Sequence, residues 1–292
     1  MQERLLRKNT ESSAKRDRDH LHSSEICKSG WCPRASWYSI TGVEPEKIDR
    51  PGRKAVNIFE EGHSIHDKYQ EALREAGVLA GMWECADCMY TFWALSPEFC
   101  IGCQSPHLRY REVPIVDEEL HIVGHGDGIV EGVPGAPKPL LIEVKSIGLG
   151  TLRIEAPLLF AKIQDKELSL QQAWNEIKRP LPAHLRQGML YLRALKMRRC
   201  VFLYEFKADQ SQKEFVVTYN EDYIADIVYG AKQVKDALER GTVVRRPLWA
   251  EDENTRECRK CPFRKKCWRL EDEAAQVPAG DGVKRVKLLK SR

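Results

Sequence analysis

The chain of 292 residues carries a formal net charge of +4, with 42% hydrophobic and 31% charged residues. This is the composition of a soluble globular protein, long enough to bury a core in one or two domains. No apolar run is long enough to cross a bilayer as a helix, so we expect no membrane-spanning helix.

The first twenty residues are polar and highly charged and lack the apolar core of a signal peptide, so we expect a disordered tail at 1–20. We therefore expect a cytoplasmic protein, or one in the host cytoplasm if its source is a virus. Disulfides are rare in that reducing compartment, so the ten cysteines are interpreted first as metal ligands.

A helix is predicted over residues 55–76, where Ile58, Ile65, Tyr69 and Leu73 recur at helical spacing. Strands are predicted between residues 111 and 146, whereas 150–183 shows no clear pattern. The remaining predictions are a helix over 183–196, strands over 200–206 and 215–219, and a helix over 221–240 that ends at Gly241. Such mixing of helices and strands favours an α/β fold.

Residues 82–108 interrupt this pattern with two cysteine pairs. The pairs are Cys85–Cys88 and Cys100–Cys103, each with two residues between the cysteines. Two such pairs predict a zinc ribbon, in which tetrahedral thiolate ligation holds a segment too small for its own core. Several aromatic residues, Trp83, Tyr90, Phe92, Trp93 and Phe99, either pack the ribbon or stack on unpaired bases.

The strand ending at Ser146 places charged side chains among apolar ones. Alternation directs Leu140, Ile142 and Val144 to one face and Leu141, Glu143 and Lys145 to the other. If the preceding turn is centred near Gly135, Asp127 lies opposite Glu143, with Cβ atoms about 5 Å apart.

Two carboxylates that close repel each other unless a cation lies between them. The pattern therefore predicts a site for Mg²⁺ or Mn²⁺ at Asp127 and Glu143, because a hard divalent ion takes carboxylates, water and substrate phosphate as ligands. Lys145, on the same face, could orient or deprotonate the attacking water or stabilise charge on a phosphate. The alternative is a hairpin with an incidental surface ion pair.

A second cysteine group lies near the C-terminus, at Cys258, Cys261 and Cys267. Three cysteines cannot all pair with one another, and a metal centre normally takes a fourth ligand. Beyond them, a basic tail at 276–292 either contacts nucleic-acid phosphates or is simply solvated.

These motifs resemble those of the PD-(D/E)XK nucleases, in the RecB-like exonuclease branch that includes iron–sulfur CRISPR-associated members. Gly62 and His66 match its first motif, Gly124 and Asp127 its second, Glu143-Val144-Lys145 its third, and Gln187 with Tyr191 its fourth. The four motifs occur in the family's order over more than a third of the chain.

The resemblance implies a role for each matched residue. The divalent ion would be bound by His66, Asp127, Glu143 and the Val144 carbonyl. Lys145 would be the catalytic lysine, and Gln187 and Tyr191 would orient it or the DNA. An N-terminal cysteine, Cys32 or alternatively Cys27, would join Cys258, Cys261 and Cys267 around a [4Fe–4S] cluster. Zinc in the same four cysteines is the competing interpretation.

The implied fold is restriction-endonuclease-like, with a central mixed sheet flanked by helices. One nuclease domain would span 21–275, including the zinc-ribbon insertion at 82–108 and the cysteine segment at 256–270, whose cluster would clamp the two chain ends together. The implied activity is metal-dependent cleavage of DNA, as an exonuclease on single strands or ends, in recombination, repair or CRISPR-type processing with a possible partner protein. The alternative is a non-catalytic DNA-binding or assembly module that uses the ribbon and the basic tail.

Overall fold

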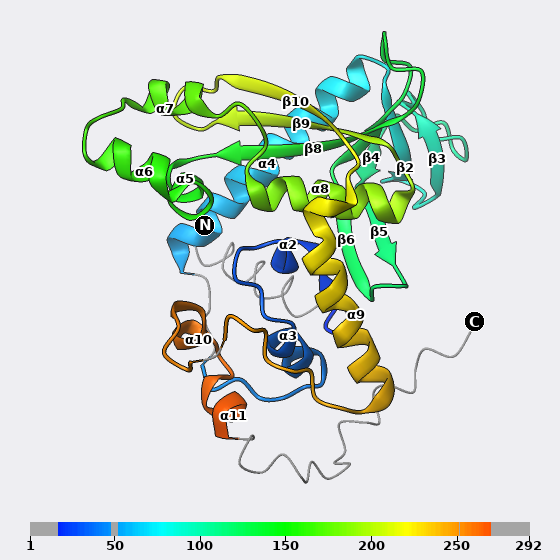
Figure 1. Cartoon of the computed structure of the whole chain (residues 1–292). Coiled ribbons are helices and arrows are strands. Elements are labelled where there is room, and N and C mark those ends of the chain that lie inside the picture. The colour runs from blue at the N-terminus through cyan, green and yellow to red at the C-terminus, as the bar shows by residue number, and fades with distance from the viewer. Residues whose placement is uncertain (1–16, 48–51, 251, 270–292) are drawn as a thin grey trace. The chain divides into compact units, whose positions relative to one another are not determined.

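The computed structural model describes residues 17–47, 52–250 and 252–269 (Figure 1). The chain divides into two compact units. One comprises Met1–Val56, Val116–Val123 and Ala225–Arg292, and the other Asn57–Ile115 and Gly124–Ile224. Residues 1–16 of the predicted N-terminal tail and the whole predicted basic tail at 276–292 lie outside the described residues.

A seven-stranded mixed sheet forms the centre of the second unit. Its order is β10-β9-β8-β7-β2-β3, and β4 pairs with β2 beside β7. The strands are β2 (Leu79–Cys85), β3 (Thr91–Leu95), β4 (Leu108–Arg111), β7 (Gly128–Val130), β8 (Leu140–Ile147), β9 (Arg199–Phe206) and β10 (Gln212–Thr218). Only the central pair, β8 and β9, is parallel among these strands.

A parallel pair needs a long crossover connection, and helices supply it here. Between β8 and β9 the chain forms α5 (Leu149–Glu155), α6 (Pro157–Gln164), α7 (Leu170–Glu176) and α8 (Pro182–Leu195). The capping box of Ser169 and Gln172 starts α7. Helices of seven or eight residues, such as α5, α6 and α7, span only two turns, which is why residues 150–183 showed no clear periodicity.

Helices cover both faces of the sheet. Helix α4 (Arg53–Glu75) packs Ile65 against Ile142, Val144 and Val201 on one face. Helix α8 lies on the opposite face, where Gly188 allows close approach to the Phe202 ring (Figure 1). The expected mixed sheet flanked by helices is therefore present.

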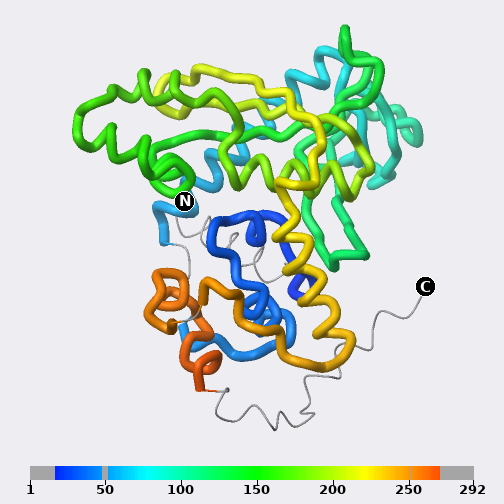
Figure 2. Tube along the Cα trace, in the orientation of Figure 1, coloured from blue at the N-terminus to red at the C-terminus, as the bar shows by residue number. Residues whose placement is uncertain are grey.

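The first unit is built from segments that lie far apart in the sequence. Its elements include β1 (Leu21–His22), α2 (Ser23–Ile26), α3 (Pro33–Ile40), α9 (Ala225–Arg240), α10 (Arg256–Lys260) and α11 (Arg264–Arg269). Helix α9 packs on α3, where Gly230 lies against Trp31 and Pro33. In Figure 2 the blue N-terminal segment and the orange C-terminal segment of this unit lie side by side.

The remaining strands, β5 (Val113–Asp117) and β6 (Ile122–Gly126), form a three-stranded sheet with β1. Strand β1 pairs in parallel with β6, with Leu21 opposite Ile122. No helix within the described residues has the length and apolar character needed to cross a membrane.

The long helices were predicted from sequence to within two residues, at α4 and α8. The helix predicted over 221–240 begins as the 3₁₀ turn η1 (Glu221–Ile224) and continues as α9. Gly241 follows with a φ of +65°, the left-handed conformation expected of a glycine at a helix end.

Replacing Gly188 in α8, with Gly62 in α4 as the comparison, tests the packing of α8. A Cβ at Gly188 would lie 2.5 Å from Phe202 Cζ, whereas nothing lies within 4 Å of a Cβ at Gly62 in α4. Replacing glycine by alanine favours a helix by about 1 kcal/mol, but overpacking a core costs about 1–3 kcal/mol. We expect Gly188→Ala to lower the free energy of unfolding and Gly62→Ala to raise it. Urea unfolding of both variants checks this, and equal stabilisation would contradict the α8 packing.

Candidate functional site

The hairpin of β7 and β8 sets the register of the candidate site. Gly128 pairs with Ile142, Ile129 with Leu141 and Val130 with Leu140. This confirms the register predicted from a turn centred at Gly135. Continuing it by one residue brings Asp127 opposite Glu143.

Asp127 is buried and held from three directions. Its Oδ2 accepts a hydrogen bond from the Val144 N–H at 2.6 Å, and its Oδ1 lies 3.1 Å from His66 Nδ1. Gln70 Nε2 donates to the Asp127 carbonyl at 2.8 Å. Burial raises the pKa of Asp127, but Lys145 and His66 outweigh it, so the net pKa is lowered and the carboxylate is ionised.

Glu143 is a buried carboxylate with one oxygen paired and one oxygen unpaired. It is 1% exposed, and its Oε2 accepts a hydrogen bond from Lys145 Nζ at 2.7 Å. Its Oε1 is buried and has no hydrogen-bond partner among the described residues. Burial, with a contribution from Asp127, raises the pKa of Glu143 to about 7, against the effect of Lys145. A buried oxygen left unpaired costs about 1–3 kcal/mol, so a missing partner is expected there.

His66 and Glu112 complete a group with Asp127. One ligand atom of each residue lies within 4.8 Å of the others. Burial lowers the pKa of His66, but the hydrogen bond to Asp127 and the charge of Asp127 outweigh this effect. The net pKa of His66 is therefore raised. Burial and the charge of Asp127 raise the pKa of Glu112.

Glu112 was missed by the sequence analysis. It lies between β4 and β5, where no alternation and no motif indicated the direction of its side chain. The Val144 N–H donates to Asp127, and its carbonyl stays a predicted ligand.

Two polar contacts involve helix α8, one within the helix and one with Tyr204 of β9. Gln187 Nε2 donates to Tyr191 Oη at 2.7 Å. Burial lowers the pKa of Lys145, but the charges of Glu143 and Asp127 outweigh this effect and the net pKa is raised. Nearby, Tyr204 Oη accepts a hydrogen bond from the Leu181 N–H at 2.8 Å and lies 2.6 Å from His184 Nδ1. Burial, with the charge of Lys145, lowers the pKa of His184 to about 3, so this histidine is neutral.

The four ribbon cysteines converge in the second unit. Cys85 Sγ lies 3.6 Å from Cys103 Sγ, and Cys88 Sγ lies 3.6 Å from Cys100 Sγ. All four sulfurs lie within 4.8 Å of one another, which is the spacing that tetrahedral ligation of one ion requires.

The other cysteine group surrounds a cavity of about 290 Å³ in the first unit. Cys32, Cys258, Cys261 and Cys267 all line it, whereas Cys27 is buried and does not. In the described part of the chain, the ligand groups that close to 4.8 Å include none of these four cysteines.

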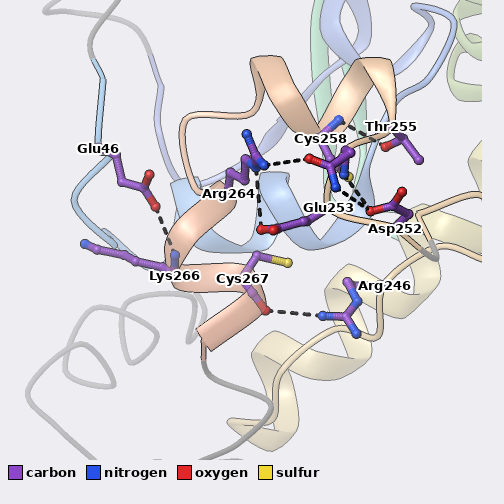
Figure 3. Close-up of polar contacts among 10 residues, drawn as sticks. Glu46, Arg246, Asp252, Glu253, Thr255, Cys258, Arg264, Lys266 and Cys267 are labelled. Carbon is purple, nitrogen blue, oxygen red and sulfur yellow. Dashed lines mark hydrogen bonds and ion pairs between the residues drawn. The ribbon is translucent and has the colours of Figure 1, made fainter.

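Polar contacts fix the segment that carries these cysteines (Figure 3). Thr255 Oγ1 accepts from the Cys258 N–H at 3.4 Å and caps α10, and Glu46 Oε1 accepts from the Lys266 N–H at 2.9 Å. Arg246 donates to the Cys267 carbonyl at 3.4 Å. Burial raises the pKa of Cys267, and the charges of Arg34 and Arg246 oppose that rise. The cavity thus combines thiols with cationic side chains.

No protein-family model matches the chain, and no curated protein sequence matches it. Among solved structures it is similar to SSO0001, at 15% identity and a TM-score of 0.43, over 91% of this chain and 95% of that one. It is also similar to an alkaline exonuclease, LHK-Exo, from Laribacter hongkongensis, at 12% identity and a TM-score of 0.39, over 89% and 96%. A structure of LHK-Exo in complex with dAMP is similar at 12% identity and a TM-score of 0.39, over 77% of this chain and 90% of that one. Similarity this low does not assign a family, and the geometry of the site carries the functional argument.

Glu112 gives a test of the metal site that does not depend on activity. We expect Glu112→Gln to weaken Mn²⁺ binding about tenfold or more, because groups beside a metal site contribute to its affinity on that scale. Calorimetric titration with Mn²⁺ measures this. Glu239→Gln is the matched control, since the Glu239 side chain is 63% exposed on α9, where it pairs with Lys235 at 4.0 Å. Equal Mn²⁺ affinity in wild type and Glu112→Gln would remove Glu112 from the site.

Proposed function

We propose that the protein is a metal-dependent DNA nuclease whose cutting site contains His66, Asp127, Glu143 and Lys145. The observation that carries this proposal is the Glu143 carboxylate, whose buried Oε1 has no hydrogen-bond partner among the described residues. A divalent cation is the partner that would satisfy this oxygen and offset the repulsion between Glu143 and Asp127.

The donor set fits Mg²⁺ or Mn²⁺. His66, Asp127 and Glu112, whose ligand atoms lie within 4.8 Å of one another, would hold the ion. Glu143 lies outside that group and would add a carboxylate oxygen from the position opposite Asp127. The Val144 carbonyl remains a further ligand in this proposal. When bound, the ion would polarise the scissile phosphate and lower the pKa of the attacking water.

The chain's own groups then orient the reaction. Lys145 extends from the same strand face as Glu143, and its Nζ can donate to a phosphate oxygen or orient the attacking water. Gln187 and Tyr191, hydrogen-bonded to each other on α8, would orient Lys145 or the DNA, as the resemblance implies. Burial of the carboxylates excludes bulk water and strengthens these interactions.

The substrate class and the family belong to the same proposal. The four matched motifs support a PD-(D/E)XK nuclease of the RecB-like branch, acting as an exonuclease on single-stranded DNA or DNA ends. The setting would be recombination, repair or CRISPR-type processing, with a partner protein that the chain does not identify.

A [4Fe–4S] cluster is proposed for the cavity of the first unit, with zinc as the competing ion. Four cysteines line the cavity, and Arg34 and Arg246 would offset the negative charge of a thiolate-bound cluster. Cys32, Cys258, Cys261 and Cys267 are the proposed ligands, because Cys27 does not line the cavity. The cluster would tie the N-terminal and C-terminal segments of this unit together.

Zinc is proposed for the four ribbon cysteines. Their sulfurs already have the spacing of a tetrahedral thiolate site, and Cys85 and Cys100 are buried. The zinc would fix the turns at the ends of β2 and β3.

Lys145→Ala tests the cutting site. We expect the variant to bind DNA and lose cleavage at least a hundredfold, because Lys145 acts on the reacting groups and not on the bulk of the DNA. End-labelled single-stranded and duplex DNA, incubated with Mn²⁺, Mg²⁺ or EDTA, measures cleavage. Lys232→Ala, at an exposed ion pair with Glu119, is the matched control and should cut normally. Unchanged cleavage by Lys145→Ala would rule out the proposed site, and DNA binding without cutting by the wild type would favour a non-catalytic binding module.

A pair of cysteine variants tests the cluster. We expect Cys32→Ser to lose iron and the visible absorbance of an iron–sulfur centre in anaerobically purified protein, and Cys27→Ser to keep both. Iron and zinc analysis accompanies the spectrum. Loss of iron in Cys27→Ser alone would reverse the ligand assignment, and zinc without iron in wild type would replace the cluster by a zinc site.

A further inference from the structure

The end of the sheet formed by β2, β3 and β4 has one buried and one exposed face. Trp83, Cys85 and Phe92 point inward and form a cluster with Leu79 and Cys100. On the opposite face Trp93 is 54% exposed and Leu95 is 47% exposed, whereas Ala80, the β2 partner of Leu95, is buried. Burial therefore accounts for Trp83 and Phe92, but it does not account for a large aromatic ring at position 93.

Two arginines share this face with Trp93. In the strand register Trp93 lies opposite Met82, and Met82 lies opposite Arg111 on its other side. One step further along, Glu84 lies between Thr91 and Arg109. Arg111 pairs with Glu84 at 3.1 Å, yet its side chain remains 60% exposed. We call this set, Trp93, Met82, Arg109 and Arg111, the ribbon face.

The ribbon face is on the same side of the sheet as the candidate cutting site. Ala80 of β2 pairs with Ile129, which pairs with Leu141 of β8. Because paired residues share a face and alternate residues repeat it, Met82 and Trp93 face the same way as Leu141 and Glu143.

The two features also adjoin along the chain. Arg111 directly precedes Glu112, whose carboxylate lies within 4.8 Å of the ligand atoms of Asp127 and His66. A chain of phosphates bound at the metal ligands could therefore continue over β4, β2 and β3, where neighbouring strands are about 4.8 Å apart.

We propose that the ribbon face binds the unpaired bases and phosphates of single-stranded DNA that extends from the cutting site. This inference rests on the proposed nuclease function and assigns a role to the zinc ribbon within it. Trp93 would stack on a base, while Arg109 and Arg111 would contact phosphates or stack on a neighbouring base. An open aromatic surface flanked by guanidinium groups matches an anionic strand with unpaired bases better than it matches an apolar protein partner.

Binding of fluorescent oligothymidine without added Mg²⁺ or Mn²⁺ tests the ribbon face without cleavage, and no chelator is used because EDTA would remove zinc from the ribbon. The strands would be about four and about sixteen nucleotides long, which spans the lengths that one OB-fold binds in single-strand-binding proteins. Trp93→Ala should weaken binding of the longer strand about fivefold or more, the scale of one lost stacking contact, and leave the short strand nearly unchanged. Trp93→Phe should restore most of the affinity, and Tyr223→Ala, at 48% exposed in η1, should bind as wild type.

The outcomes separate this inference from the nuclease proposal. Zinc content equal to wild type shows that Trp93→Ala keeps the ribbon intact. Wild-type affinity of that variant for the longer strand overturns the ribbon face even if Mn²⁺-dependent cutting is normal. Weakened binding by Trp93→Ala, in a protein that cuts no DNA, supports the ribbon face and rejects the nuclease proposal. A change of oligomeric state in Trp93→Ala with unchanged DNA binding would identify the face as a contact between copies of the chain.

Discussion

The site depends on the presence of an acidic side chain in the middle of a buried strand. Glu143 occupies β8, which has strands on both sides and helices on both faces. An ionised carboxylate there loses its hydration, and a single lysine partner at Oε2 leaves Oε1 unsatisfied. Such an arrangement costs stability, so it is expected where a ligand provides the missing interaction.

The surrounding structure holds that costly group in place. Asp127 is fixed by the Val144 N–H, so the strand that carries Glu143 also orients the second carboxylate. His66 reaches Asp127 from α4, whose apolar side packs on the same strand through Ile65. The packing that stabilises the sheet therefore also sets the distances between the ligands, and the site is built on rigid elements.

The two cysteine groups differ in arrangement. The four ribbon sulfurs lie within 4.8 Å of one another, whereas Cys32, Cys258, Cys261 and Cys267 line a cavity of about 290 Å³. Spacing along the sequence could not show this. Both groups contain cysteines separated by two residues, and only the fold sets how far such a pair lies from the other cysteines of its group.

The sequence by itself determined the elements whose signals are local or periodic. Alternation along β8 predicted which face carries Glu143 and Lys145, and turn residues around Gly135 predicted the register that brings Asp127 opposite Glu143. Helical periodicity predicted α4 and α8, which carry His66, Gln187 and Tyr191. These patterns depend on neighbours within a few residues, so one sequence contains them.

Only the tertiary structure decided what depends on distant segments. It placed Glu112 beside Asp127, although Glu112 belongs to no periodic element. It placed Cys32 and not Cys27 at the cavity, because the packing of the N-terminal segment on the C-terminal one chooses which sulfur faces inward. It also separated buried Trp83 from exposed Trp93, since strand alternation defines two faces and only the packing around a sheet decides which of them is covered.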